Sequence, residues 1–221
     1  MTKPPSWDEL FADPRFHWKQ PDRGVVAVAE QWWLQGRRRL LDFGCGAGRH
    51  VAYLQTQGFE VDAFDLAPRG LEACAAAVRE ACLPARLVRA DMTQLPFADT
   101  AFDAGIAINV LNHNSRARLR MAADEVYRVL KPGGRFYLTV LNTWDWRYGS
   151  GEEVEPDSFL LAEGPEAGIL HHFFSEDDLR DWLSDFSILS LTRESGELLL
   201  STRPAGDPVV RDGWAVQVER P

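Results

Sequence analysis

The chain has 221 residues, of which 45% are hydrophobic and 26% are charged, values typical of a globular protein. No apolar run reaches the roughly 18 to 20 residues that a membrane-spanning helix requires. The net charge is −9, and nucleic-acid binders rely on basic faces that displace counterions. We therefore expect neither a membrane nor a nucleic acid as partner.

The three cysteines, Cys45, Cys74 and Cys82, include no C-x-x-C pair. This pattern favours a reducing compartment and argues against a disulfide framework or a structural metal site. The segment MTKPPSWDEL at the N-terminus has no apolar signal-peptide core. We expect a cytoplasmic protein without a bound metal, and the sequence leaves the oligomeric state open.

Strands and helices alternate along the first two thirds of the chain. Helical spacing of apolar residues or helix-starting signals predict helices over 22–35, 48–57, 68–82 and 115–130. Short apolar runs predict strands over 38–43, 59–65, 85–91, 102–109 and 135–142. This order predicts an α/β fold with a doubly wound, mostly parallel sheet and helices on both of its faces.

The alternation ends after residue 141. Residues 142–172 are rich in glycine, glutamate, proline and aromatic residues and show no clear periodicity. Connections of this length are usually functional or disordered. A helix is predicted over 175–184, with Ser175 as N-cap, and strands follow at 186–193, 197–203 and 213–219.

The segment LLDFGCGAGRH places three glycines at the end of the first predicted strand. Ligands of open α/β sheets bind at the carboxyl ends of strands, so this loop is a candidate binding site. A dinucleotide fingerprint requires a third glycine three residues after the second. Here Gly44, Gly46 and Gly48 are followed by Arg49 at that position, which is a poor fit to a pyrophosphate.

Two aspartates close the next strands. Asp65 ends the second strand, where a carboxylate can accept hydrogen bonds from both ribose hydroxyls. Asp91 ends the third strand, where it can accept from the amine of an adenine, with Met92 against the ring. The helix start after Gly48 can bind a carboxylate. These features indicate an adenosine ligand without phosphates, and S-adenosylmethionine fits.

The region 38–141 resembles the core of class I S-adenosylmethionine-dependent methyltransferases. The resemblance is carried by LLDFGCGAGRH, VDAFDLAPRGLE, RADMTQLPFADTAFD and FDAGIAINVLNHNSRARLRMAADEVYRVLKPGGRFYLTVLN. HHFFSEDDLRDWL and the strands after it resemble the C-terminal end of a bacterial small-molecule subgroup. The resemblance implies a Rossmann-like, seven-stranded sheet whose last strand is antiparallel.

The resemblance also implies the cofactor contacts. Residues of the glycine loop contact the methionyl group, those after the second strand the ribose, those after the third strand the adenine, and those after the fourth strand lie beside the sulfonium. In chain order they are Gly44, Cys45, Gly46, Gly48, Asp65, Leu66, Asp91, Met92, Asn109 and Val110. The N/D-P-P-Y/F/W segment of amino-methylating nucleic-acid and glutamine methyltransferases is replaced after the fourth strand by AINVLNHN.

Two histidines are candidates for a catalytic role. His113 follows the fourth strand, where the methyl group should point, but a loop histidine bonded to backbone is the alternative. His171 is the second candidate. It and His172 should point to opposite faces of an extended segment, so that one faces the acceptor while the other lies on the surface or caps an element. Asp42 either orients the glycine loop or simply ends its strand.

Residues 142–172 are predicted to form the acceptor side of the pocket, as a lid. Their large aromatic groups, Trp144, Trp146, Tyr148 and Phe159, are unusual for a solvated linker. Their acidic side chains would favour a neutral or cationic acceptor; these are Glu152, Glu153, Glu155 and Asp157.

The chain is accordingly divided into four parts of one domain. Residues 1–37 form a helical segment that caps the cofactor or substrate, and residues 38–141 form the cofactor-binding core. Residues 142–172 form the lid, and residues 173–221 complete the sheet.

The expected function is methyl transfer from S-adenosylmethionine to a small molecule, by in-line displacement. Positioning and exclusion of water are the main tasks of the protein, and a general base is needed only for a protonated acceptor. One alternative is a non-catalytic S-adenosylmethionine-binding protein. The other, an NAD-dependent oxidoreductase, is disfavoured by the glycine spacing and by Asp91.

Overall fold

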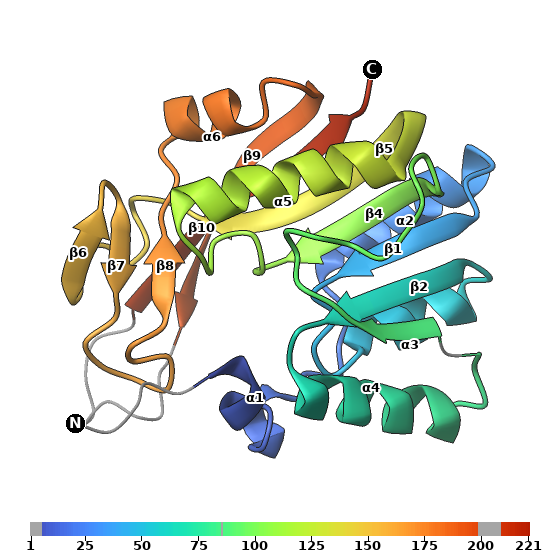
Figure 1. Ribbon diagram of the computed structural model, residues 1–221, viewed down its shortest axis with the longest axis horizontal. Helices are drawn as coiled ribbons and strands as arrows, with labels where there is room; N and C mark the ends of the chain where they lie inside the picture. The colour runs from blue at the N-terminus through green and yellow to red at the C-terminus, as the bar shows by residue number, and fades with distance from the viewer. Residues whose placement is uncertain (1–5, 85, 199–208) are drawn as a thin grey trace.

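The computed structural model describes residues 6–84, 86–198 and 209–221. Its centre is a seven-stranded sheet with the order β3-β2-β1-β4-β5-β10-β9 (Figure 1). The strands are β1 (Arg39–Phe43), β2 (Glu60–Asp65), β3 (Arg86–Arg89), β4 (Phe102–Ile108), β5 (Leu130–Leu141), β9 (Ser187–Leu198) and β10 (Val209–Glu219). The first five run parallel to one another, and β10 is antiparallel to both β5 and β9. The predicted sheet, with its antiparallel last strand, is confirmed.

Helices cover both faces of the sheet. They are α2 (Arg23–Leu34), α3 (Arg49–Thr56), α4 (Pro68–Glu80), α5 (Arg116–Val129) and α6 (Glu176–Trp182). Neighbouring residues of β1 show the division, because side chains alternate between faces. Leu40 joins a core with α2, α3 and α4, whereas Leu41 joins a core with α5 and α6. Both cores contain fully buried side chains, including Trp32 and Phe43.

Some boundaries differ from those predicted. The strands predicted at 186–193 and 197–203 are replaced by the single strand β9, and residues 199–203 of the second one lie outside the described part of the chain. β5 begins at Leu130 rather than at 135, because Leu130 already pairs with Phe102 of β4 and a bulge takes up the residues before Arg135, with Gly133 at φ +72°. β10 begins at Val209 rather than at 213, because pairing with β9 extends it beyond the end of β5.

The segment after β5 folds into a second, three-stranded antiparallel sheet. Its strands are β6 (Glu152–Glu155), β7 (Ser158–Leu160) and β8 (Leu170–His172). Phe159, Leu161 and Phe173 pack with Leu141 at the end of β5 to form its core. Strands of three or four residues are too short to show an alternating pattern, which explains why the sequence showed no periodicity here.

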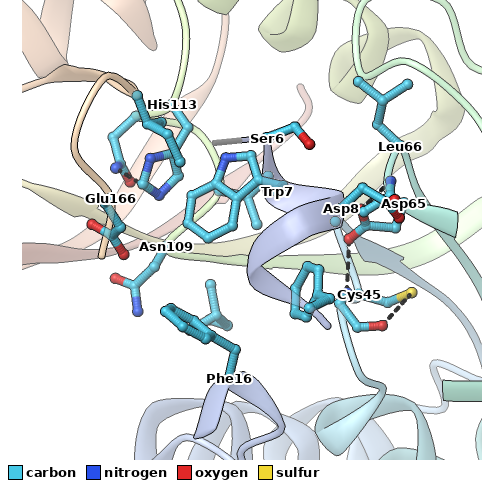
Figure 2. Close-up of a pocket in the computed structure, with 18 of the residues that line it drawn as sticks. Ser6, Trp7, Asp8, Phe16, Cys45, Asp65, Leu66, Asn109, His113 and Glu166 are labelled. Atoms are coloured by element: carbon cyan, nitrogen blue, oxygen red, sulfur yellow. Dashed lines mark hydrogen bonds between the residues drawn. The ribbon is translucent and has the colours of Figure 1, made fainter. Parts of the chain in front are cut away.

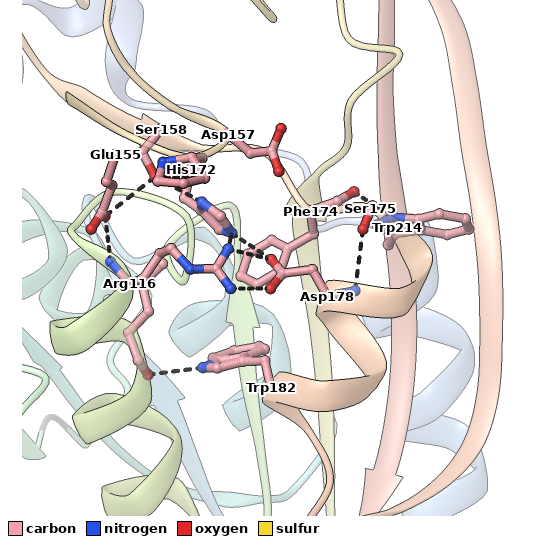
Figure 3. A network of polar contacts seen from close by, with 12 residues as sticks. Arg116, Glu155, Asp157, Ser158, His172, Phe174, Ser175, Asp178, Trp182 and Trp214 are labelled. Atoms are coloured by element: carbon pink, nitrogen blue, oxygen red, sulfur yellow. Dashed lines mark hydrogen bonds and ion pairs between the residues drawn. The ribbon is translucent and has the colours of Figure 1, made fainter. Parts of the chain in front are cut away.

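A polar network fastens this small sheet to the core (Figure 3). Arg116 at the start of α5 donates to Asp178 of α6, and its backbone N–H donates to Glu155 of β6 at 2.6 Å. His172 lies between Asp178 and Ser158, with nitrogen–oxygen distances of 2.7 and 2.8 Å. As predicted, His172 and His171 point to opposite faces of their strand.

The N-terminal residues reach the carboxyl ends of the strands as a short helix, α1 (Trp7–Leu10), and a 3₁₀ turn, η1 (Pro14–Phe16) (Figure 1). Ser6 and Glu9 form a capping box at the start of α1. Asp8 accepts a 2.8 Å hydrogen bond from the backbone of Arg69 in α4. Among the described residues, none of the helices has the length and apolar character needed to cross a bilayer.

Candidate active site

A cavity of about 1200 Å³ lies at the carboxyl ends of the strands. Figure 2 shows its two sides, with Cys45, Asp65 and Leu66 on one and Asn109, His113 and Glu166 on the other. All ten residues predicted to contact the cofactor line this cavity. Sheet topology therefore brings together side chains from the ends of four strands, as expected for this fold.

The glycine loop needs its glycines for two reasons. Gly44, Gly46 and Gly48 have φ values of +73°, +50° and +85°, a region that side-chain-bearing residues rarely adopt. A Cβ atom at Gly48 would lie 2.3 Å from the sulfur of Cys74 in α4, and one at Gly46 would meet the ring of Phe11 at 2.8 Å. The loop is therefore packed tightly between α4 and the N-terminal segment.

Asp65 holds the glycine loop as well as facing the cavity. Its carboxylate accepts hydrogen bonds from the backbone N–H groups of Gly46 at 2.8 Å and Ala67 at 2.9 Å. Burial raises the pKa of Asp65, while these backbone bonds act in the opposite direction. A carboxylate has about four acceptor sites, so two remain for a ligand. The following residue, Leu66, is 58% exposed toward the opening.

Asp91 is paired with an arginine that the sequence did not single out. It accepts from the backbone and hydroxyl groups of Thr93 at 2.9 and 2.8 Å and from Arg118 of α5 at 2.5 Å. Burial raises the pKa of Asp91, but these hydrogen bonds outweigh it and the pKa falls below its usual value. Asp91 is therefore an ionised acceptor on the cavity wall, with Met92 beside it.

Asn109 and Val110 follow β4 at the middle of the cavity. Asn109 has a φ of +57°, and its backbone N–H donates to Thr139 of β5. Val110 packs against the glycine loop, since a Cβ atom at Gly44 would lie 2.6 Å from its side chain. The left-handed turn thus directs the Asn109 side chain into the cavity.

Asp42 lies beneath the glycine loop and is only 1% exposed. Burial raises its pKa to about 7, although the charge of Arg49 acts in the opposite direction. Cys45 lines the cavity, but its thiol is not activated, because a hydrogen bond with Cys74 and burial raise its pKa well above the usual value. All three cysteines are free thiols.

The two histidine candidates lie together at the acceptor side. Their ring centroids are 4.5 Å apart, and Trp7 covers His113 with a centroid distance of 4.6 Å. Burial and the charge of His171 hold the pKa of His113 well below its usual value, so this imidazole is neutral. His113 lines the cavity, whereas the fully buried His171 stands behind it.

His171 is held between two acceptors. Its Nδ1 lies 3.0 Å from the carbonyl oxygen of Ile169, and its Nε2 lies 3.0 Å from the carboxylate of Glu166. Both ring nitrogens of His171 therefore face oxygen acceptors of the protein. Glu166 also accepts from Arg147 at 3.2 Å. Burial raises the pKa of Glu166, but His171, His113 and Arg147 together lower it to about 2.

Comparisons with known proteins decide the family. A family model described as a methyltransferase domain matches residues 41–138. A methyltransferase of Encephalitozoon cuniculi is 31% identical over 212 residues, which cover 89% of this chain and 91% of that protein. The chain is a class I S-adenosylmethionine-dependent methyltransferase. S-Adenosylmethionine is its methyl donor, and the oxidoreductase alternative falls with this assignment.

Solved structures share the fold of the methyltransferase. An S-adenosylmethionine-dependent methyltransferase of Methanosarcina mazei is 25% identical, with a TM-score of 0.71 and coverage of 91% of this chain and 98% of that one. The 1,6-didemethyltoxoflavin-N1-methyltransferase of Burkholderia thailandensis, solved with S-adenosylhomocysteine, is 21% identical, with a TM-score of 0.65. Its match covers 95% of this chain and 83% of that one.

The acceptor side of the methyltransferase differs from the predicted lid in its composition. Of the four aromatic residues considered, only Trp146 lines the cavity. Tyr148 and Phe159 instead pack against Phe173, and Trp144 packs against Trp214. The part of the segment that does reach the cavity is Leu161, Glu163–Glu166, Gly168 and Ile169 together with Trp146 and Arg147.

The acidic side chains used to predict a neutral or cationic acceptor are absent from the cavity wall. Glu155 accepts from Arg116 on the core side, and Asp157 accepts from the hydroxyl of Tyr148. Glu152 and Glu153 of β6 are both exposed to solvent. The argument for that acceptor class therefore loses its structural basis.

The N-terminal segment supplies aromatic walls that the sequence reasoning missed. These are Trp7, Phe11, Phe16 and Trp18. The available signal was the Ser6–Glu9 spacing in SWDE, which marks a capped helix start. Arg118, Arg147, Glu166 and Arg211 were also missed, because no local pattern distinguishes them from surface charges.

Proposed function

We propose that this methyltransferase acts on a small molecule bound beside Asn109 and His113. The observation that carries the proposal is the cavity itself, which extends from the glycine loop to Arg147 and is walled by α1. A pocket lined by aromatic side chains with a few converging polar groups suits a small ligand.

The cavity has the groups that the cofactor requires, and we assign them as predicted. Asp65 would hold the ribose, Asp91 the adenine amine, and the glycine loop the methionyl end. The bound cofactor supplies a methyl carbon activated by its positive sulfur. The protein holds the acceptor in line with that carbon and keeps water out. Phe11, which packs on the glycine loop, and Trp7, which packs on His113, favour this exclusion.

His113 is the group that we assign to proton removal from an acceptor hydroxyl or ammonium. It is neutral and therefore able to accept a proton, and it lies on the cavity wall. His171 cannot do so, since both of its nitrogens already face acceptors. We propose that His171 positions His113 instead. An acceptor that is already deprotonated would need neither histidine.

A tRNA acceptor is the second candidate, because a tRNA N(3)-methylcytidine methyltransferase of Drosophila melanogaster is 26% identical over 208 residues. Its match covers 60% of that protein. The net charge of −9 opposes binding to a polyanion. We place the enzyme in the cytoplasm, where the free cysteines stay reduced.

The experiment compares methyl transfer from labelled S-adenosylmethionine to a small-molecule panel and to unmodified tRNA. Turnover of a small molecule without labelling of tRNA is expected. Labelling of tRNA alone would overturn the proposal.

A further inference from the structure

Arg211 points into the cavity from the first residues of β10. Its neighbour Asp212 is 1% exposed and is bonded to Arg193 at 2.6 Å and to Asn142 at 2.5 Å. Consecutive side chains of a strand point to opposite faces. The buried Asp212 therefore directs Arg211 toward the cavity, where Arg211 forms part of the wall.

The other arginines of the cavity wall are each bonded to a protein group. Arg15 bonds Asp13, Arg49 the carbonyl of Gln20, Arg89 the carbonyl of Leu66, Arg118 Asp91, and Arg147 both Asp145 and Glu166. Within residues 6–84, 86–198 and 209–221, Arg211 makes no such side-chain bond. A guanidinium has five N–H donors in a planar fork that fits an oxyanion.

The two acids whose charges act on Arg211 already accept hydrogen bonds from other residues. Asp145 accepts from Arg147 at 2.8 Å, and Glu166 is shared between Arg147 and His171. Arg211 is an exposed side chain at the cavity wall. Partial removal from water and the charges of two neighbouring arginines lower its pKa, whereas the charges of Asp145 and Glu166 raise it. The guanidinium thus lacks a full counter-charge of its own, which an anionic ligand would supply.

The sheet order indicates which ligand Arg211 faces. The groups assigned to the cofactor follow β3, β2, β1 and β4, whereas β10 lies beyond β5. Neighbouring strands are about 4.8 Å apart, so β10 is about 10 Å from β4 on the side away from the adenine. This space belongs to the acceptor.

We propose that Arg211 binds a carboxylate of the methyl acceptor, an inference that rests on the proposed small-molecule function. One guanidinium fork matches one carboxylate in a bidentate pair. Trp146 and Leu161 line the cavity too, and the backbone of Trp146 bonds that of Val210, next to Arg211. They can pack against an apolar body. The acceptor class is therefore a small organic acid with an apolar or aromatic body.

The test compares carboxylic acids with their neutral amides, using calorimetry on the S-adenosylhomocysteine complex. The probes are 4-hydroxybenzoate and 4-hydroxybenzamide, indole-3-acetate and indole-3-acetamide, and cinnamate and cinnamamide. At least one acid should bind about tenfold more tightly than its amide, as expected for a charge-assisted pair. R211Q should reduce that ratio to near one, and R211K should retain part of it.

Two controls distinguish a specific contact with the acceptor from a general effect of charge and from a contact with the cofactor. R180Q removes an exposed arginine of α6 that pairs with Glu176 outside the cavity, and it should leave the ratio unchanged. Affinity for S-adenosylhomocysteine should be equal in the wild type and R211Q. The proposal is wrong if no acid binds more tightly than its amide, or if the preference survives in R211Q. It is also wrong if R211Q lowers the affinity for S-adenosylhomocysteine, because that result would assign Arg211 to the carboxylate of the cofactor. Failure of the small-molecule function differs from these, since it appears as tRNA labelling.

Discussion

The imidazole rings of His113 and His171 lie edge to face, with centroids 4.5 Å apart. His113 comes from the loop after β4 and His171 from β8 of the small sheet. This contact joins the cofactor-binding core to the segment after β5. It also places the ring of His171, which is hydrogen-bonded to Glu166 and Ile169, directly behind the neutral ring of His113.

Replacing His171 should change the protonation of His113 in a measurable direction. The charge of His171 is the second cause, after burial, of the low pKa of His113. In H171Q this charge is absent, so the pKa of His113 should rise while remaining below its usual value. NMR titration of the histidine ring protons measures the change. H172Q, which alters the opposite face of β8, is the control, and an unchanged His113 in H171Q would contradict the coupling.

Asp65 gives a direct test of the cofactor site. D65N keeps the size of the side chain but removes its charge and part of its acceptor capacity, both for Gly46 and for the ribose that we propose it binds. Affinity for S-adenosylhomocysteine should fall at least about tenfold, because each hydrogen bond to a charged group contributes about 1.5–3 kcal/mol. Calorimetry measures this change. The control is D62N, because Asp62 lies on the same strand but pairs with Arg39 outside the cavity. Equal losses of affinity in the two variants would show that Asp65 is not part of the site.

The tight packing of the glycine loop predicts unequal costs for two similar substitutions. Gly48 and Gly133 both have positive φ, at +85° and +72°, but an added Cβ meets Cys74 only at Gly48. G133A should lower the free energy of unfolding by about 1–2 kcal/mol, the cost of a left-handed residue. G48A should lower it further and weaken S-adenosylhomocysteine binding. Urea unfolding of both variants measures the difference, and equal costs would show that α4 moves freely.

The core of the fold was accessible from the sequence because its signals are local. Buried parallel strands give short apolar runs such as RRLLDF, and the aspartates that matter stand directly after them, as Asp65 and Asp91 do. The alternation predicts a parallel sheet, and the carboxyl ends of its strands lie at one edge, so these aspartates are expected to converge there. The predicted cofactor residues therefore all line one cavity.

The acceptor side could not be predicted in the same way. α1 has four residues, and it is held by the Arg69–Asp8 contact with α4 rather than by its own periodicity. Arg211 reaches the cavity only because β10 extends past the end of β5. Its direction depends on Asp212 being buried on the other face. These are tertiary facts that no local pattern contains.

Two buried groups should give the unfolding free energy opposite pH dependences. Asp42 has a pKa of about 7 in the folded protein, above its ordinary value of 3.8. Between these values the folded state holds a proton that the unfolded state releases, so Asp42 lowers stability as pH rises. His50 has a folded pKa of about 3, below the usual 6.5, because it is buried and the positive charge of Arg49 lies nearby. Between these values the unfolded state binds the extra proton, so His50 raises stability as pH rises.

Urea unfolding between about pH 4.5 and 6.5 separates the two groups, each contributing at most about 1.4 kcal/mol per pH unit. Relative to the wild type, D42N should gain stability as pH rises through this window, and H50Q should lose it. Differences that stay constant with pH in either variant would contradict the assigned protonation states.

The last prediction concerns Asp178, which joins α6 to the small sheet through Arg116 and His172 (Figure 3). Both partners lower the pKa of Asp178 below its usual value, although burial acts in the opposite direction. D178N turns one acceptor oxygen into a donor that faces these donors. The free energy of unfolding should fall by about 1–3 kcal/mol, which is the cost of leaving such buried donors without an acceptor. Because His172 belongs to β8, the small sheet should loosen before the core does.

Hydrogen exchange by mass spectrometry tests the location of this effect. In D178N, residues 152–172 should exchange faster, while the strands β1, β2 and β4 keep the rate of the wild type. D177N removes a neighbouring, exposed acid from the same first turn of α6, so it controls for the helix dipole. If D178N and D177N behave alike, or if exchange rises equally across the core, then the network does not hold the small sheet in place. In that event the packing of Phe159, Leu161 and Phe173 on Leu141 would be what holds the small sheet against the core.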